Sequence, residues 1–229
     1  TKKSFFDFQI QGKKISYNNI LDMNSGLDFL NEFNEPTAVI IKHNNACGVA
    51  SSKNILDALK KAIKSDKKSA FGGVVLFNRR ITYEISKIIL SKFFQVIIAP
   101  GFNKESIKEF KKKKNLIVIN SKEILKKEKN NTRSVRGGFL IQETDNDKIV
   151  KKNFSIVSKN KKISKNEFED VLFGFKIAKH TKSNAVILVK NKQTIGIGAG
   201  QMSRVISAEI ANLKAKEESL EVSGAAMAS

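Results

Sequence analysis

The sequence predicts an α/β fold, because runs of apolar, β-branched residues alternate with segments of helical periodicity. The first run, Thr37–Lys42, is continuous and typical of a buried strand. Ser51–Ser65 follows it and places Ile55, Leu59 and Ile63 on one face of a helix. With 41% hydrophobic residues over 229 positions, the chain can bury a core. The repeated strand–helix order predicts a mostly parallel sheet covered by helices.

The same alternation continues to about residue 120. The predicted elements are a strand at Gly73–Phe77, a helix at Tyr83–Phe94, a strand at Gln95–Ala99, a helix at Lys104–Lys113 and a strand at Leu116–Ile119. Pro100-Gly101 stops the middle strand, because proline cannot donate to a sheet ladder. We expect all of these strands in one sheet.

A polar stretch rich in Lys and Asn, from about Lys122 to Lys162, separates these elements from a second group. Its one apolar run is Gly137–Gln142. After it, Ser164 and Glu167 have the spacing of a capping box that opens a helix. The second group is this helix as far as Ala178, a hairpin of Ala185–Lys190 and Thr194–Ile197, and a last helix from about Gln201 to Glu218. We therefore expect two α/β lobes, residues 1–148 and 149–229.

The chain is strongly basic, with 42 Lys and Arg against 22 Asp and Glu, a net charge of +20. Basic proteins bind nucleic acid through phosphate contacts, so a basic nucleic-acid-binding module is one interpretation. Only five of the positive residues are Arg, which reads base edges and phosphates best, and the lysines are spread along the chain. A solvated lysine surface that attracts anionic substrates is therefore favoured, and nucleic acid is not the expected partner.

The cysteine content and the hydropathy of the chain limit the cellular compartment in which we expect the protein. One cysteine, Cys47, excludes a disulfide framework and a Cys-rich zinc site. No apolar run reaches the roughly 18 residues of a membrane helix, and the N-terminus lacks the apolar segment of a signal peptide. We expect a soluble, cytoplasmic protein without a metal site or a membrane partner.

Lys42 and His43 come at the carboxyl end of the first predicted strand, where ligands bind in open α/β sheets. A histidine there can move protons near neutral pH, and the adjacent lysine can stabilise developing negative charge. An ordinary loop histidine is the alternative. His180, at a helix end, is better explained as a cation that favours the helix dipole. For Cys47 a buried thiol is favoured over a nucleophile, because no third group that would activate it is identifiable.

Two glycine-rich segments can present backbone N–H groups to a ligand. In Gly196–Arg204, the arginine falls in the first turn of a helix, where a cation opposes the dipole. A bound ligand or a carboxylate partner would explain it. Ser69–Gly73 is a tight turn before a strand, where the backbone can approach a flat ligand. By itself, each segment is better explained as a plain turn.

Taken together, these segments resemble one family, the transformylase domain of bifunctional purine biosynthesis enzymes. Those enzymes couple aminoimidazole carboxamide ribonucleotide (AICAR) formyltransferase to IMP cyclohydrolase. The most specific match is Lys42-His-Asn-Asn-Ala-Cys-Gly48, against the family pattern Lys-His-x-Asn-Pro-Cys-Gly. The other matches, in the family's order over nearly the whole chain, are Ile15–Asp22, Ser69–Gly73, Val96–Phe102, Val135–Gln142, Lys179–Asn184 and Ile195–Arg204.

The resemblance implies two cytidine-deaminase-like α/β lobes without zinc, the second of them incomplete. It implies formyl transfer from 10-formyltetrahydrofolate, as co-substrate, to the 5-amino group of AICAR. It also implies a homodimer, and a cyclohydrolase domain outside this chain. A monovalent cation is compatible with the resemblance, but no residue pattern specifies one.

The resemblance also implies roles for individual residues. His43 matches the proton-transfer histidine and Lys42 the lysine that stabilises the transition state. With His43, three further positions match contacts to AICAR, namely Gly72, Asn184 and Arg204. Val205 and Phe71 match folate-binding positions.

Measured against the family pattern, Ala46 replaces a proline and Gln95 replaces an acidic residue that contacts substrate. The pattern further implies segments before Thr1 and after Ser229. We therefore expect this chain alone to be inactive or nearly so. An idle fragment is a third interpretation, although Lys42, His43 and both glycine segments are present.

Overall fold

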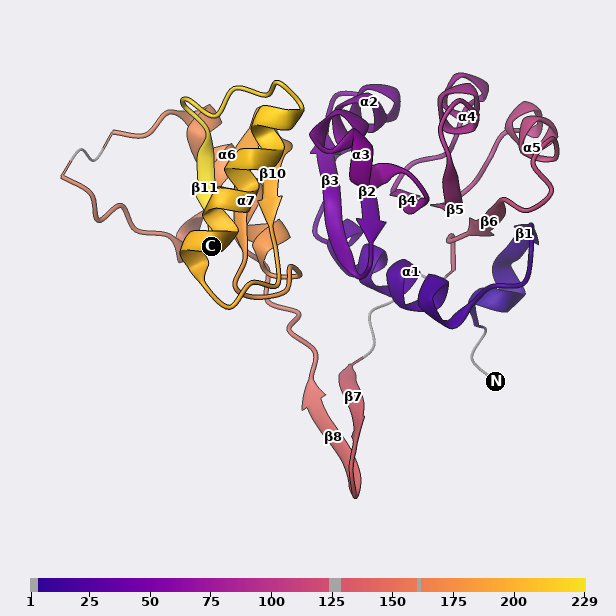
Figure 1. Ribbon diagram of the computed structural model, residues 1–229, viewed down its shortest axis with the longest axis horizontal. Helices are drawn as coiled ribbons and strands as arrows, with labels where there is room; N and C mark the ends of the chain where they lie inside the picture. Colours follow the sequence, from indigo (N-terminus) through magenta and orange to yellow (C-terminus); the bar gives the residue numbers. More distant parts are fainter. Residues whose placement is uncertain (1–3, 124–128, 160–161) are drawn as a thin grey trace.

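The computed structural model describes residues 4–123, 129–159 and 162–229 (Figure 1). Most of the chain is built on one nine-stranded sheet, with the strand order β1-β6-β5-β4-β2-β3-β10-β9-β11. The strands of this sheet are β1 Gln9–Gln11, β2 Thr37–Lys42, β3 Asn45–Ser51, β4 Gly73–Phe77, β5 Phe94–Ala99, β6 Ile117–Asn120, β9 Val186–Lys190, β10 Gln193–Gly198 and β11 Ala226–Ala228. The remaining strands, β7 Asn130–Val135 and β8 Gly138–Glu143, form a separate hairpin.

Helices cover both faces of the sheet. They are α1 Tyr17–Leu30, α2 Ile55–Ser65, α3 Lys67–Ala70, α4 Tyr83–Leu90, α5 Lys104–Phe110, α6 Lys165–Ala178 and α7 Arg204–Glu217, with short 3-10 turns at Phe5–Phe8 and Lys151–Asn153. The fold is therefore mixed α/β, as the alternation of runs predicted. The sheet is mixed rather than mostly parallel as predicted, because among its described strands only β4, β5 and β6 pair in parallel and the other pairs are antiparallel.

The order of elements repeats along the chain. A first unit consists of α1, β2, β3, α2 and β4, and a second unit consists of α6, β9, β10, α7 and β11. In each unit the hairpin strands are antiparallel, and the last strand pairs antiparallel with the first. The units meet where β3 pairs with β10, so the strand order reads symmetrically outward from that seam. The two predicted lobes thus share one sheet. The boundary at residues 148 and 149 stays a prediction, as does the likeness of each unit to a cytidine deaminase.

Buried side chains lie in layers above and below the sheet. On one face, α1 and α6 pack through Met23, Leu27 and Ile177 against sheet residues such as Val39. On the other face, α2, α4 and α5 form a second cluster. Helix α7 packs on β9 and β10 through Ala211, on the face opposite α6. The core is therefore continuous across both units only beneath α1 and α6.

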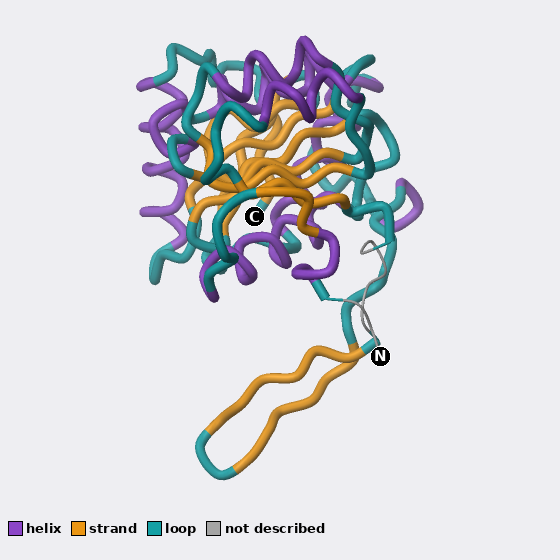
Figure 2. Tube along the Cα trace, turned by 90° about the vertical axis from the view of Figure 1, so that its right-hand side faces the viewer, coloured by secondary structure: helices purple, strands orange, loops and turns teal. Residues whose placement is uncertain are grey.

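The β7–β8 hairpin projects away from the layered body (Figure 2). All residues of both strands are exposed, including Phe139, Leu140 and Ile141. Gly137, at its turn, has a positive φ of 82°. The predicted apolar run Gly137–Gln142 is thus strand-forming but not part of the core.

Two elements of the first unit are not predicted from the sequence. α1 contains Asn18, Asn24 and Gly26, which are poor helix formers, and it is stabilised instead by burial of its apolar face. β3 includes Gly48, whose added Cβ would lie 2.1 Å from the Ala62 carbonyl of α2. In both elements a glycine, which is typical of loops, allows a neighbouring element to approach closely: β4 at Gly26 and α2 at Gly48.

Candidate active site

The hairpin between β2 and β3 turns through only two residues, His43 and Asn44, here called the His43 turn. Both have positive φ values, 53° and 61°, the conformation that a two-residue turn of twisted strands requires. Two residues of α1 hold the turn. The Asp22 carboxylate accepts a 2.6 Å hydrogen bond from the Asn44 N–H, and the Ser25 hydroxyl donates to the Asn44 carbonyl at 3.0 Å. The backbone is thereby fixed without use of the imidazole.

The His43 side chain is exposed. Within the described residues its ring nitrogens have no hydrogen-bond partner, and both are free to exchange a proton with a ligand. A non-glycine residue held at positive φ costs about 1 kcal/mol or more, and such residues cluster at functional sites. The turn therefore presents a strained, unpartnered histidine to solvent.

Lys42 points from the end of β2 toward the turn before β4. Its ammonium donates a 2.5 Å hydrogen bond to the Phe71 carbonyl. Gly72 has a φ of 72°, and a Cβ added there would lie 3.2 Å from the Lys42 Nζ. The Gly72 N–H donates to the Phe93 carbonyl at 2.6 Å. The predicted Ser69–Gly73 turn and Lys42 are therefore in direct contact, and glycine is needed where the ammonium passes.

The second unit reaches the same edge of the sheet through the segment before β9. The Lys182 N–H donates to the Asn45 side-chain oxygen at 3.3 Å, one residue beyond the His43 turn. The Lys182 carbonyl in turn accepts from the Gly200 N–H at 2.7 Å. This relay brings the loop after β10, which leads into α7, beside the His43 turn.

Asn184 and Arg204 lie on this second side. The Asn184 amide nitrogen donates to the carbonyls of Gln201 and Met202, both at 3.1 Å, so its side-chain oxygen stays available. Arg204 is the first residue of α7 and is exposed. In the described part of the chain its guanidinium has neither a hydrogen bond nor an ion pair, so the predicted carboxylate partner is not found there.

The glycine segment before α7 differs from the prediction in one respect. Gly196 and Gly198 are in strand β10, where the α7 backbone lies against them. Only Gly200, with a φ of 69°, is in the turn itself. Close helix packing therefore explains two of the three glycines, and only the third bears on the site.

The site does not lie where the rule for open α/β sheets, which suggested it, places a ligand. β2 is antiparallel to β4, so its carboxyl end lies beside the amino ends of β4 and β5. Ligands in open parallel sheets bind at the carboxyl ends of the strands, and this site is at the opposite edge of the parallel part. The carboxyl ends of β2 and β10 meet there instead, because β3 runs antiparallel to both.

Apolar side chains border the site on both sides. Val205 and Phe71, the two predicted folate-binding residues, are both 65% exposed. Phe71 lies against Phe93, with ring centroids 4.9 Å apart. Exposed apolar side chains next to a set of cations are typical of a binding surface.

Cys47 and His180 lie away from this arrangement. Cys47 is 8% exposed, and burial is the main reason that the pKa of its thiol is raised to about 12, so it is protonated and unreactive at neutral pH. The His180 ring shares a 2.9 Å hydrogen bond with Glu32 and packs edge-on against Phe29. Both residues are structural, as favoured from the sequence.

Sequence reasoning missed several residues that organise the site. Asp22 and Ser25 hold the His43 turn, Asn45 links it to the second unit, and Phe93 stacks on Phe71. An Asn-rich pair after a β-branched run is a hairpin signal that indicates the turn, but the aspartate that holds Asn44 is 22 residues earlier, in helix α1.

No group of three or more metal-ligating side chains is found in residues 4–123, 129–159 and 162–229. Over the same ranges, no helix has the length and apolar content needed to span a bilayer.

A known protein family matches most of the chain. The sequence model of the AICARFT/IMPCHase bienzyme family matches residues 1–214, which includes every residue of the site described above.

Proposed function

The chain belongs to the AICARFT/IMPCHase bienzyme family of purine biosynthesis, and we propose that it carries the formyl-transfer reaction of that family. The reaction moves a formyl group from 10-formyltetrahydrofolate to the 5-amino group of AICAR. The observation that carries this proposal is His43, held in a strained turn with its ring unpartnered, directly after Lys42.

The chemistry requires a base next to a cation. The 5-amino group of AICAR is a poor nucleophile because the carboxamide on its ring withdraws electron density. As its nitrogen attacks the formyl carbon, it must lose a proton, and His43 accepts it. The Lys42 ammonium stabilises the negative charge that develops on the formyl oxygen. The bond between the formyl carbon and N10 of the folate then breaks, and the protonated His43 gives its proton to N10, so that tetrahydrofolate is the second product.

Cations and polar groups from both units bind the nucleotide in this proposal. Arg204 supplies a planar donor for the phosphate, at the amino end of a helix where an anion is favoured. Asn184 offers its free side-chain oxygen, and Gly72 allows the backbone to approach the base. Val205 and Phe71 contact the folate. We propose a homodimer on the family resemblance alone.

The test is binding of AICAR by isothermal calorimetry, with formation of tetrahydrofolate by the longer protein that the family pattern implies as the activity readout. We expect saturable binding of AICAR that Arg204→Gln weakens by about 10- to 100-fold, the value of a charge-assisted contact. Arg133→Gln is the matched control, because Arg133 lies in the exposed β7–β8 hairpin and carries the same charge. It should leave AICAR binding unchanged.

A salt titration with mixed-sequence DNA tests the alternative. Tight, sequence-tolerant DNA binding with a steep salt dependence, together with no saturable binding of AICAR, would overturn the proposal in favour of a nucleic-acid-binding module. Equal weakening by Arg204→Gln and Arg133→Gln would show that AICAR senses only the general field.

A further inference from the structure

A pocket of about 270 Å³, here called the Lys176 pocket, lies between the two units, at the end of β2 opposite to the His43 turn. We propose that it binds a free α-amino acid with an apolar side chain of about the size of leucine. The first unit lines it with the segment before β2, and the second unit lines it with α6 and the turn between β9 and β10. The proposal does not depend on the formyl-transfer reaction.

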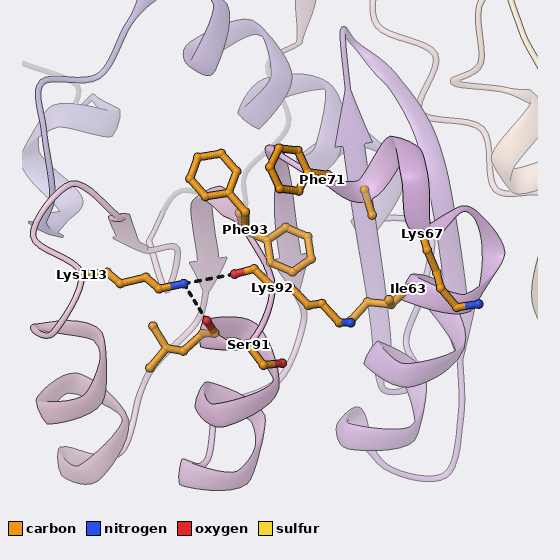
Figure 3. Close-up of a pocket in the computed structure, with 10 residues that line it drawn as sticks. Ile63, Lys67, Phe71, Ser91, Lys92, Phe93 and Lys113 are labelled. Carbon is orange, nitrogen blue, oxygen red and sulfur yellow. Dashed lines mark hydrogen bonds between the residues drawn. The ribbon is translucent and has the colours of Figure 1, made fainter.

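The Lys176 pocket is separate from the larger pocket at the candidate active site. That larger pocket, of about 350 Å³, is lined by Phe71 and Phe93 next to Lys42, and it belongs to the proposed folate-binding surface (Figure 3). No described residue lines both pockets. β2 has six residues, so at about 3.3 Å per residue its two ends are roughly 20 Å apart. A small ligand at one end therefore does not touch the other.

Apolar side chains form one wall of the Lys176 pocket. The rings of Phe33 and Phe173 lie with their centroids 4.9 Å apart, and Leu172 lines the pocket beside them. The two phenylalanines are 8% and 4% exposed, so the core holds them in place without a ligand. A branched aliphatic side chain that packs on this preformed wall loses its contact with water. The pocket volume is just below the 300 Å³ or so at which sites for drug-sized molecules begin, so the expected ligand is small.

Lys176 brings a cation into this pocket without a matching anion. Its ammonium lies 5.5 Å from the centre of the Phe33 ring, and in the described part of the chain it has neither a hydrogen bond nor an ion pair. Burial is the largest influence on the pKa of Lys176 and lowers it, and the nearby charges of Glu32 and Glu35 do not restore it. The charged ammonium is therefore poorly solvated where it lies. A ligand carboxylate would supply the missing partner.

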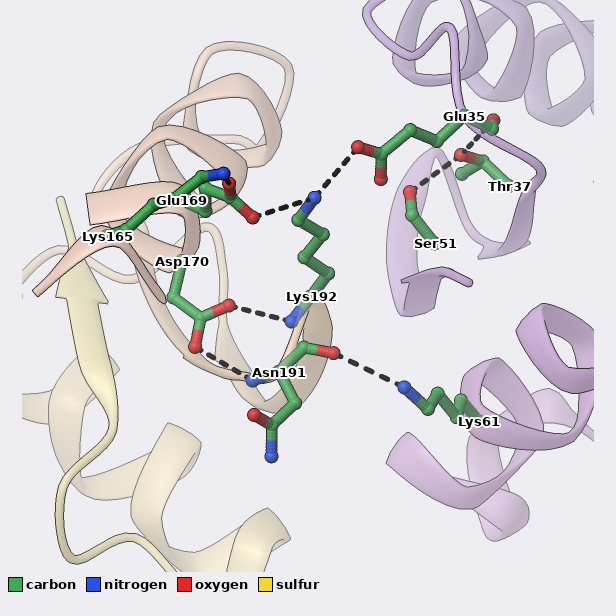
Figure 4. Close-up of polar contacts among 9 residues, drawn as sticks. All are labelled: Glu35, Thr37, Ser51, Lys61, Lys165, Glu169, Asp170, Asn191 and Lys192. Atoms are coloured by element: carbon green, nitrogen blue, oxygen red, sulfur yellow. Dashed lines mark hydrogen bonds and ion pairs between the residues drawn. The ribbon is translucent and has the colours of Figure 1, made fainter. Parts of the chain in front are cut away.

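The two carboxylates of the pocket already share one cation. Lys192 pairs with Glu35 at 2.7 Å and with Glu169 at 3.0 Å (Figure 4). The bond to Glu35 uses its Oε1 atom, and Oε2 of the same carboxylate has no bond within the described residues. The Glu35 side chain is 53% exposed, so a ligand ammonium can reach Oε2 while Lys192 stays in place.

Together these groups specify a zwitterion. The charged side chains that line the pocket are two carboxylates and two ammonium groups, so their formal charges cancel. Glu35 is close enough to raise the pKa of Lys176, but the two form no ion pair, which leaves room for a group between them. The α-carboxylate of an amino acid would bind Lys176, its ammonium would bind Glu35, and its side chain would lie against Leu172. A molecule with only one of the two charges would leave one of these groups unmatched.

The experiment is a titration of the whole chain, labelled with nitrogen-15 and followed by its amide chemical shifts. The probes are L-leucine, 4-methylpentanoate, which is leucine without its amine, and 3-methylbutylamine, which is leucine without its carboxylate. We expect saturable shifts at Glu35, Phe173 and Lys192. The affinity for leucine should be at least about tenfold higher than for either of the other two probes.

Two substitutions test the two charges separately. Lys176→Met should weaken the binding of leucine and of 4-methylpentanoate about tenfold, without weakening 3-methylbutylamine. Glu35→Gln should weaken leucine and 3-methylbutylamine, without weakening 4-methylpentanoate. Lys108→Met is the matched control, because Lys108 is an exposed lysine of α5 outside the pocket. It should change none of the three affinities.

The proposal is overturned by equal affinity for the three probes, by equal effects of Lys176→Met and Lys108→Met on leucine, or by the absence of saturable shifts at the pocket. The comparison of the three probes uses the unsubstituted chain, so it decides the matter even if a variant does not fold. AICAR added at saturation should leave the affinity for leucine unchanged. Displacement of leucine by AICAR would place leucine in the active site instead and would also overturn the proposal.

Discussion

The two units of the sheet each contain a two-residue hairpin turn, and the two turns differ in how their side chains are used. The Lys192 turn, Asn191 and Lys192 between β9 and β10, has positive φ values of 54° and 53°, close to those of the His43 turn. Its two N–H groups both donate to the Asp170 carboxylate at 2.7 Å (Figure 4). The Lys192 ammonium pairs with Glu35 at 2.7 Å and with Glu169 at 3.0 Å. The backbone N–H and carbonyl groups of this turn and the Lys192 ammonium are therefore engaged, whereas no described residue bonds to the Asn191 side-chain amide.

The His43 turn has the same backbone, but in the described chain neither of its side chains forms an ion pair as Lys192 does. An aspartate from the preceding helix again accepts from the turn, but only one N–H is held, and the imidazole has no partner in the described chain. The largest single influence on the pKa of Lys192 is burial, which lowers it, but the hydrogen bonds to Glu35 and Glu169 together outweigh burial and raise the pKa overall. The difference teaches that the strained backbone is a property of the repeat, whereas a titratable side chain without a described partner is particular to the turn of the first unit. This is the basis of the proposed role of His43.

Replacement of the first residue in each turn by glycine should separate stability from activity. In the longer protein that the family pattern implies, where the rates in this and the following predictions are measured, His43→Gly removes the proton acceptor and should lower formyl transfer by about 100- to 10,000-fold. It should also stabilise the fold by up to about 1 kcal/mol, because glycine adopts positive φ without the steric cost. Urea unfolding and the rate of tetrahydrofolate formation measure the two effects. Asn191→Gly, the equivalent change in the Lys192 turn, should leave the rate unchanged, and a loss of rate there would contradict the comparison.

Replacement of the aspartate that holds each turn should separate stability from binding. The change beside the Lys192 turn should cost more stability, and the change beside the His43 turn should cost more AICAR binding. Asp170→Ala deprives two N–H groups of a charged acceptor and should lower the free energy of unfolding by about 2 kcal/mol. AICAR binding should persist, since the Lys192 turn is at the opposite edge of the sheet. Asp22→Ala breaks one such bond, so it should cost less stability but weaken AICAR binding and activity. Equal effects on binding from the two variants would show that the His43 turn has no special role.

Two positive-φ glycines test whether the wall beside Lys42 matters. Gly72→Ala should cost about 1 kcal/mol in backbone strain and, by displacing the Lys42 ammonium, should lower the rate of formyl transfer. Gly137→Ala meets the same backbone cost in the exposed hairpin, where an added Cβ contacts nothing within 4 Å. Its rate of formyl transfer should equal that of the unsubstituted chain. If Gly72→Ala also kept the full rate, Lys42 would not need its present position.

The smallest effect concerns a contact between the units. Burial by itself raises the pKa of Asp66, but hydrogen bonds from Lys214 and Ser69 outweigh it and lower the pKa below its ordinary value. A carboxyl whose pKa is lowered on folding stabilises the protein above its unfolded pKa of about 4 and loses that contribution as the pH falls through the folded pKa. Asp66→Asn should therefore flatten the fall in unfolding free energy below about pH 4. Glu221→Gln, which removes an exposed partner of Lys190, is the control and should change the curve little.

Local sequence patterns predict some elements of this fold well. β2 and β4 have the predicted bounds, Thr37–Lys42 and Gly73–Phe77, because they are continuous apolar runs buried on both faces. α6 begins after Ser164, as its capping box predicts. These elements carry their own signal, since period, cap and hydrophobicity agree within a few residues.

Elements and site residues that depend on distant contacts were not predicted. α1 and β3 contain Gly26 and Gly48, and sequence propensity predicts that a glycine interrupts a helix or a strand. In the structure each glycine instead lies directly against another element. The residues that organise the site also depend on contacts between distant parts of the chain. Lys42 and His43 stand out from their local pattern, whereas Asp22, Phe93 and the Asn45–Lys182 bond depend on which strands become neighbours. No spacing in the sequence encodes that a strand end of the second unit meets the His43 turn.

The seam between β3 and β10 has a mechanical consequence. In the described chain the two strands have one pair of residues in register, Gln193 with Ala50, and the Thr194 hydroxyl makes the next two bonds, to the N–H and carbonyl of Val49. Nearer the site, the units are joined by the Asn45–Lys182 bond and by Lys214 with Asp66. Near the site, a few polar contacts therefore join the units in addition to the shared apolar core. Of these contacts the Lys214–Asp66 pair is ionic, so raised ionic strength should weaken it and loosen this part of the seam.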